Sequence, residues 1–177
     1  MEEKVPPPVV EAARHGDADA LAQICERLYP RIYKYVSYKV DDLRDAEDLA
    51  GEVFVRMLGA IRGQKGDLEA WLFRIAGNVV TDHYRKRAVR SGEVELPDEI
   101  AGGDDPGAAV ERKLDGDRLR KGLQTLTEEQ RETVILRVVM GYEHHEVAAI
   151  MGRSTGATRA LQFRALAALR DALEKRL

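Results

Sequence analysis

Apolar residues in the first half of the chain recur at steps of three and four positions, the spacing typical of an amphipathic α-helix. The pattern predicts three successive helices, and the alternation typical of a β-strand is absent. Asp17 or Asp19 can cap the first helix and Asp67 the third, because an N-cap carboxylate accepts hydrogen bonds from the free N–H groups of the first turn. The three apolar stripes run over residues 21–36, 49–58 and 68–79.

Residues 90–107 interrupt this periodicity. They contain four glycines and two prolines, are acidic beyond Arg90, and have no sustained apolar period. A stretch of this length without secondary structure is uncommon inside a compact domain. The composition therefore predicts a flexible linker between two domains.

A second helical group is predicted after the linker. Thr127 and Gln130 have the spacing of a capping box and open a helix that Gly141 ends. A short helix over residues 143–151 follows, then a turn at Gly152 and a longer final helix. Two helices joined by a glycine-containing turn are the plan of a helix-turn-helix unit.

These patterns together predict an all-α protein made of two small helical domains. Residues 1–16 form a lead that is either disordered or a regulatory docking segment. The first domain is expected over residues 17–90, a flexible acidic linker over 91–112, and the second domain over 113–177.

Charge is unevenly distributed along the 177 residues, although the net charge is only −3. Residues 1–90 are neutral overall, residues 91–111 carry a net charge of −7, and residues 112–177 carry +4. The single cysteine excludes an internal disulfide framework. Apolar runs are too short for a membrane span and no secretory signal is present, so we expect a cytoplasmic protein without membrane insertion.

The candidate for enzymatic chemistry is the Glu-His-His-Glu run at residues 143–146. A zincin needs His-Glu-x-x-His, but the position of its second histidine is Ala149. Cys25 lies on an apolar stripe and is expected to be a core thiol rather than a nucleophile. We therefore expect no catalytic residue, no metal site, no cofactor and no enzymatic activity.

Two basic helices favour nucleic-acid binding. The final helix carries Arg153, Arg159, Arg164 and Arg170, which can contact phosphates or guanine, and Gln162, which can read adenine. Residues 71–87 interleave aromatic and basic side chains, a combination that stacks on unpaired bases and holds phosphates. The structural alternatives are a solvated basic face on an ordinary hairpin and a buried tryptophan before a basic helix C-terminus.

Four motifs resemble conserved regions of bacterial sigma factors of the extracytoplasmic-function group, which have only regions 2 and 4 joined by a linker. Residues 45–54 (DAEDLAGEVF) are similar to region 2.2, and residues 70–78 (AWLFRIAGN) to regions 2.3–2.4. Residues 126–132 and 141–154 resemble region 4. Two independent signatures in the family's order, on either side of a linker, are more specific than a lone helix-turn-helix.

The resemblance implies a transcription initiation factor whose partners are core RNA polymerase, promoter DNA and an anti-sigma factor. The helix over residues 45–58 would dock on the clamp helices of the polymerase. The resemblance assigns this contact to Asp45, Asp48, Leu49 and Glu52. Of these, Asp48 and Glu52 are expected on the exposed side of the helix and Leu49 on the inward side.

The resemblance also implies two promoter contacts. The loop over residues 60–67 and the helix after it would melt the minus-10 element and hold a flipped base and the phosphates of the non-template strand. These minus-10 positions are Phe73, Ile75, Asn78, Arg85 and Arg87. The minus-35 duplex would be read by Arg153, Ser154, Arg159, Phe163 and Arg164. For Ile75 and Phe163, packing is the alternative.

Two other functions remain open on the sequence. A stand-alone helix-turn-helix regulator would use residues 1–90 as a dimerisation or sensing module, and a sigma-mimicking protein would bind polymerase without using a promoter. The region 2-like motifs disfavour the first, and the aromatic and basic helix disfavours the second. Because neither half is strongly basic and the linker repels phosphate, we expect the free protein to bind promoter DNA negligibly at physiological salt.

Overall fold

The computed structural model describes residues 4–90 and 108–174, without the side chains of residues 108–115. Every regular element in these residues is a helix, which confirms the predicted all-α fold. The elements in chain order are α1 (Pro7–Arg14), α2 (Ala18–Lys39), α3 (Leu43–Ala60), the 3-10 turn η1 (Ile61–Gly63), α4 (Leu68–Arg90), α5 (Ala108–Leu123), α6 (Glu128–Val134), the π-helical turn η2 (Ile135–Val139), α7 (His144–Met151) and α8 (Thr155–Glu174).

Three predicted helix caps are present. A carboxylate oxygen of Asp17 accepts a hydrogen bond from the backbone N–H of Ala20 at 2.8 Å, and Asp67 accepts from Ala70 at 2.8 Å. Thr127 forms the expected capping box at the start of α6. These caps place the starts of α2, α4 and α6, because each satisfies N–H groups that have no partner within the helix.

Helices α2, α3 and α4 pack around a shared apolar core. Ile24 and Ile32 of α2, Val53 of α3 and Leu72 of α4 are fully buried in it. Cys25 is half-buried and packs against the same core, in agreement with the prediction of a core thiol.

Residues 4–16, part of the segment predicted as either a disordered lead or a regulatory docking segment, contain helix α1. Helix α1 contacts α2 and η1; its Val10 and Ala13 are buried, and so is Val5 directly before it. Periodicity did not reveal α1 because it has only eight residues and begins at consecutive prolines. Proline suits a first helical turn, where the N–H groups have no partner within the helix.

The second group contains the predicted helix-turn-helix unit. Gly152, at φ 63°, turns the chain between α7 and α8, which pack against each other. Helix α5 begins at Ala108, inside the range 91–112 that was predicted as linker. The remainder of that prediction, residues 91–107, lies outside the described residues.

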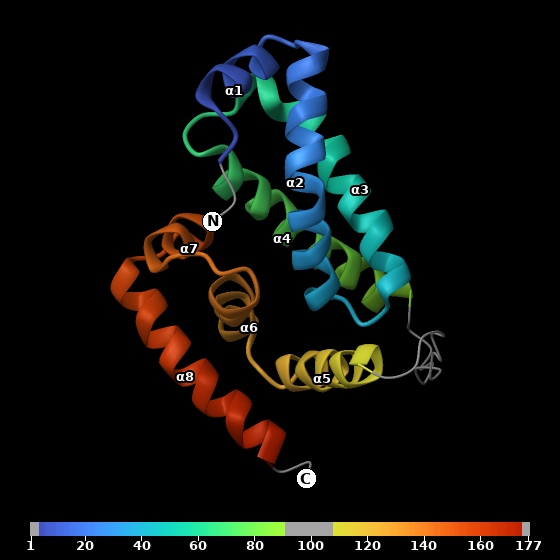
Figure 1. Cartoon of the computed structure of the whole chain (residues 1–177), viewed down its shortest axis with the longest axis vertical. Helices are drawn as coiled ribbons and strands as arrows, with labels where there is room; N and C mark the ends of the chain where they lie inside the picture. The colour runs from blue at the N-terminus through green and yellow to red at the C-terminus, as the bar shows by residue number, and fades with distance from the viewer. Residues whose placement is uncertain (1–3, 91–107, 175–177) are drawn as a thin grey trace.

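The second helical group packs on the first. Helix α7 contacts α4, η2 contacts α2, and one hydrophobic cluster includes residues of both groups. Figure 1 shows α6 and α7 on the side that faces α2 and α4, with α8 on the outer side. The sequence pattern predicts two domains connected through a linker. It does not predict this contact between them, because periodicity identifies an apolar face but not the partner of that face.

Substitutions at two valines of α3 test which face of this helix is buried in the core. Val53 is fully buried, whereas Val55 is 69% exposed. Val53→Ala removes buried methyl groups and leaves a cavity, so we expect it to lower the free energy of unfolding by about 2 kcal/mol. Val55→Ala is the matched control and should change it by less than about 0.5 kcal/mol. Urea denaturation followed by circular dichroism measures both. Equal losses would contradict the orientation of α3.

Candidate nucleic-acid interface

Helix α4 carries the predicted minus-10 residues in different environments. Phe73 is 1% exposed and Ile75 is half-buried, whereas Asn78, Arg85 and Arg87 are exposed. Of the three residues predicted to form the base pocket, only Asn78 is therefore fully accessible in this arrangement. Phe73, which the resemblance places at the pocket for a flipped base, is a buried packing residue in the arrangement described.

Phe73 packs between two tyrosines, one from each helical group. Its ring centroid lies 5.2 Å from that of Tyr35 and 5.3 Å from that of Tyr142, with the ring planes nearly perpendicular. The Tyr142 hydroxyl donates to Glu69 at 3.3 Å and accepts from Arg31, which itself lies 3.0 Å from the Glu69 carboxylate. Burial raises the pKa of Tyr142, so its hydroxyl stays protonated and able to donate.

A buried ammonium group joins α2 to α6. The Lys39 side chain is 3% exposed; its Nζ lies 2.6 Å from Glu128 and 3.2 Å from the Tyr35 hydroxyl, and it also donates to Glu132. The Tyr35 hydroxyl donates to Glu132 at 2.6 Å. Burial opposes the charge on Lys39, but Tyr35, Glu132 and Glu128 outweigh it and raise the pKa of Lys39 above its usual value. The ammonium therefore stays charged within the interface.

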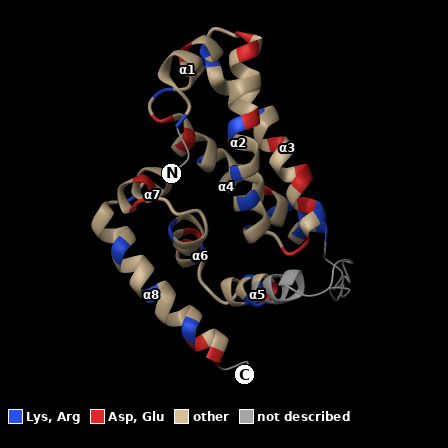
Figure 2. Ribbon diagram, viewed as in Figure 1, with Lys and Arg blue, Asp and Glu red and all other residues tan. Residues whose placement is uncertain are grey.

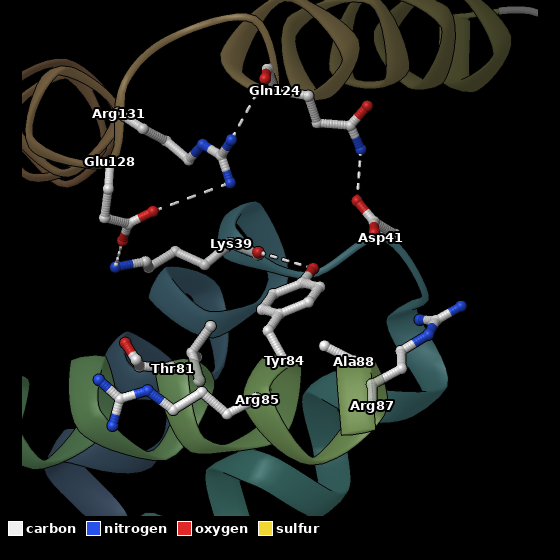
Figure 3. A pocket seen from close by; sticks show the side chains of 11 residues that line it. Lys39, Asp41, Thr81, Tyr84, Arg85, Arg87, Ala88, Gln124, Glu128 and Arg131 are labelled. Atoms are coloured by element: carbon white, nitrogen blue, oxygen red, sulfur yellow. Dashed lines mark hydrogen bonds and ion pairs between the residues drawn. The ribbon is translucent and has the colours of Figure 1, made fainter. Parts of the chain in front are cut away.

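Two grooves lie between the groups, and the exposed minus-10 residues line them. One, of about 320 Å³, contains Asn78 of α4 opposite Glu129 of α6. The other, of about 820 Å³, contains Arg85 and Arg87 of α4 together with Arg131 of α6. Figure 3 shows the second groove, with the side chain of Arg131 across from α4. Carboxylates of α6 thus face the part of α4 that was predicted to meet a DNA strand.

Tyr84, one of the aromatic residues interleaved with basic ones, has a structural role here. Its hydroxyl donates to the backbone carbonyl of Lys39 at 3.2 Å. Burial, and then the nearby Asp41 carboxylate, raise the pKa of Tyr84 to about 12. The phenol therefore stays protonated and links α4 to the end of α2.

Helix α3 places the predicted polymerase-contact residues in three environments. Asp48 is exposed, Asp45 is half-buried, and Glu52 accepts from Arg56 at 2.5 Å. Leu49 is only 6% exposed and belongs to the core, so it does not form part of the surface. The expectation that Leu49 faces inward and Asp48 outward agrees with the structure.

Sequence reasoning missed an exposed apolar component of the α3 surface. Val55 is 69% exposed and Leu58 is 48% exposed. The three- and four-residue spacing places Leu58 in the buried stripe over residues 49–58, because spacing alone does not show where the core ends. Figure 2 shows acidic positions along the same helix.

Helix α8 presents three of the predicted minus-35 residues to solvent. Arg159 and Arg164 are exposed, and Phe163 is 79% exposed, which excludes the packing alternative for Phe163 in this arrangement. Figure 2 shows basic positions spaced along α8. An exposed aromatic ring between two arginines is a surface able to contact nucleic acid.

The other two predicted minus-35 residues already have partners. The Ser154 hydroxyl accepts from the backbone N–H of Ala157 at 3.1 Å, at the start of α8. Arg153 donates to the Glu129 carboxylate of α6. These two residues therefore support the turn and the α6 contact in the arrangement described.

The run at residues 143–146 begins α7. The backbone N–H of Glu143 donates to Glu146 at 2.9 Å, and together the two residues form a capping box. Among residues 4–90 and 108–174, no group of three or more His, Cys, Asp or Glu side chains is placed to hold a metal ion. Within the same residues, no helix has the length and apolar character needed to cross a membrane.

Both helical groups match family models. The Sigma-70 region 2 model matches residues 24–90, and the Sigma-70, region 4 model matches residues 122–171. The first match covers helices from the first group, and the second covers helices from the second group.

Curated relatives are ECF RNA polymerase sigma factors. The chain is 34% identical over 168 residues to BldN of Streptomyces coelicolor, which covers 91% of this chain and 63% of BldN. It is 34% identical over 180 residues to ShbA of Streptomyces griseus, covering 94% of each. It is 30% identical over 174 residues to SigC of Mycobacterium tuberculosis, covering 92% of this chain and 85% of SigC. The chain thus spans less than two thirds of BldN but most of ShbA and SigC.

Solved structures have the same fold. CnrH, in complex with the cytosolic domain of CnrY, has a TM-score of 0.75 at 24% identity and covers 97% of this chain and 99% of that one. RpoE of Bartonella quintana, co-crystallised with the anti-sigma factor NepR, has a TM-score of 0.71 at 25% identity and covers 86% and 96%. The chain therefore belongs to the sigma-70 family of RNA polymerase sigma factors, within the ECF group.

Proposed function

We propose that this protein is an alternative sigma factor that binds core RNA polymerase and directs promoter-specific initiation. The observation that carries the proposal is that exposed arginines occur on α4 and on α8, one helix in each of the two matched regions. A sigma factor needs no catalytic group, metal or cofactor, because the polymerase performs the chemistry. In this role the protein is not an enzyme and works in the cytoplasm beside RNA polymerase.

The proposed polymerase contact is the outer face of α3. Asp45, Asp48 and Glu52 supply its carboxylates, and the exposed side chains of Val55 and Leu58 supply apolar area beside them. Charged groups mainly steer the encounter, while apolar area removed from water contributes most of the affinity. Leu49 acts from beneath by holding the helix against its core.

The proposed minus-10 contact lies on α4. Arg85 and Arg87 hold phosphates of the non-template strand, and Asn78 donates and accepts hydrogen bonds at a flipped base, beside Ile75 and Phe73. Extruding a base costs a few kcal/mol of stacking, which an aromatic or apolar pocket can offset. The second helical group covers Phe73, so this contact requires the two groups to separate first.

The proposed minus-35 contact lies on α8. Arg159 and Arg164 reach guanine edges or phosphates in the major groove, and Phe163 packs on apolar base edges such as the thymine methyl group. Arg153 and Ser154 lie at the start of the same helix, where phosphates are favoured by free N–H groups. Arg153 would exchange its Glu129 partner for a phosphate.

An anti-sigma factor is the proposed regulator, by analogy with the RpoE structure that contains NepR. The runner-up function, a stand-alone helix-turn-helix regulator, explains α7 and α8 but gives no use to the outward carboxylates and apolar side chains of α3. A sigma-mimicking protein would need the α3 surface but not exposed arginines on α8.

Run-off transcription tests the function directly. Core RNA polymerase on fragmented genomic DNA from the source organism should yield discrete new transcripts only when this protein is added. Their aligned start sites would give both promoter elements. Polymerase binding without new transcripts would support the sigma mimic, and absence of both would support the stand-alone regulator.

A substitution at Arg159 tests the proposed contact with the minus-35 duplex. We expect Arg159→Ala to lower transcription from a minus-35-dependent promoter roughly tenfold and to relax selectivity at one base position, since a good arginine–guanine pair discriminates by about 1–3 kcal/mol. Arg170 is 71% exposed near the end of the same helix and is not one of the minus-35 positions that the resemblance implies, so Arg170→Ala provides the matched control. Equal loss on both variants, without any change in base preference, would contradict a reading role for Arg159.

A substitution at Glu132 tests whether the two helical groups must separate before α4 can bind the minus-10 strand. Glu132→Ala removes one partner of the buried Lys39 charge, so we expect the two groups to separate more often and the free protein to bind a single-stranded minus-10 oligonucleotide roughly tenfold more tightly than the wild type. Resonance energy transfer between labels on α3 and α8 measures the separation, and fluorescence anisotropy measures the binding. Glu174→Ala, at the exposed end of α8, is the control. Wider separation without tighter binding would show that closure does not limit access to α4.

A further inference from the structure

The loop between α3 and α4 is fastened to the N-terminal helix through one buried side chain. This loop consists of η1 and residues 64–67. Gln64 is 4% exposed, whereas its neighbours Lys65 and Gly66 are exposed. The loop therefore has an inner side held by Gln64 and an outer side open to solvent.

Every hydrogen-bonding position of the Gln64 amide is used. Its Oε1 accepts from Arg14 of α1 twice, from Nε at 3.1 Å and from Nη2 at 2.7 Å. Its Nε2 donates to the backbone carbonyls of Lys65 at 2.9 Å and Gly66 at 3.1 Å. The guanidinium of α1 thus orients an amide that in turn fixes two carbonyl groups of the loop.

Arg14 is held in place through the packing of its helix. Its Nη1 also lies 3.0 Å from the carboxylate of Glu11, but that carboxylate is 58% exposed and a solvated ion pair of this kind contributes little. Val10 and Ala13 anchor α1 in the core of the first group. At the far end of the loop, Gly66 adopts φ 77°, a conformation that only glycine adopts readily. The hydrogen bonds of Gln64 thus hold the middle of the loop, directly before a turn that requires glycine at position 66.

We propose that α1 is a promoter-selectivity element, in which Arg14 and Gln64 are positioning residues that preset the loop to receive a base of the minus-10 strand. This rests on the proposed function, in which the loop over residues 60–67 contacts that element. The outer positions Arg62, Lys65 and Gly66 would meet the base, while neither positioning residue touches DNA. A preset loop loses little conformational entropy on binding, and it fits one base better than another because it does not reshape around each.

If Arg14 and Gln64 only stabilised the fold, their substitution would have a different effect on transcription. Loss of a stabilising hydrogen bond alone would lower the midpoint of thermal unfolding and reduce transcription from every promoter by the same factor. Loss of a positioning contact instead changes the ratio between promoters. The ratio of transcription from the cognate promoter to that from promoters substituted in the minus-10 element therefore separates the two roles.

The test uses the full chain with core RNA polymerase. For Arg14→Ala and for Gln64→Ala we expect this ratio to fall roughly tenfold, with the dissociation constant for core polymerase within about twofold of wild type. Backbone amides of residues 63–67 should exchange with deuterium roughly tenfold faster. The double variant should lower this ratio no further than either single variant does, because both substitutions remove the same contact. Arg14→Lys, which keeps one donor, should restore part of the ratio.

Glu11→Ala is the matched control, since it removes the other partner of Arg14 but leaves the bond to Gln64, and it should keep the wild-type ratio. An unchanged ratio in Arg14→Ala would overturn the proposal. If Arg14→Ala loses helical content, Arg14→Lys decides by the same ratio. A wild-type protein without any promoter selectivity would instead reject the proposed function, and the selectivity role with it.

Discussion

The buried ammonium of Lys39 is the interaction on which the arrangement of the two helical groups depends. Taking a charge out of water costs several kcal/mol, and the partners that offset this cost, Glu128 and Glu132, come from the opposite group. Such a pair specifies geometry more than it adds net stability, because water would solvate the same charges in the separated state. The closed arrangement is thus well defined and still able to open.

The covered residues of α4 have one role in the closed arrangement and another in the proposed open arrangement. In the closed arrangement Phe73 packs between Tyr35 and Tyr142, and Asn78 lines a groove opposite an acidic helix. In the proposed open arrangement the same residues would meet an unpaired base. Aromatic rings suit both environments, because a flat apolar face packs as well on another side chain as on a base. This dual use adds a structural reason to the weak binding of free promoter DNA expected from charge.

The remaining proposed surfaces are accessible without opening. Val55 on α3 and Phe163 on α8 are both largely exposed while Phe73 is buried. Docking of α3 on polymerase can therefore precede separation of the groups, and the minus-10 face would be uncovered after the protein has reached its partner. Helix α1 adds to this plan through Arg14 and Gln64, which hold the loop that leads into α4.

The sequence by itself determined most of the helices, the caps at Asp17, Asp67 and Thr127, and the family, because caps and periodicity act within one or two turns of the chain. It did not reveal α1 or α5. The tertiary structure alone decided that Phe73 is buried and that Lys39 is an interface charge. Lys39 and Glu132 lie 93 positions apart in the chain. A local pattern shows that a side chain is apolar or charged, but only the packing of distant helices decides which group surrounds it.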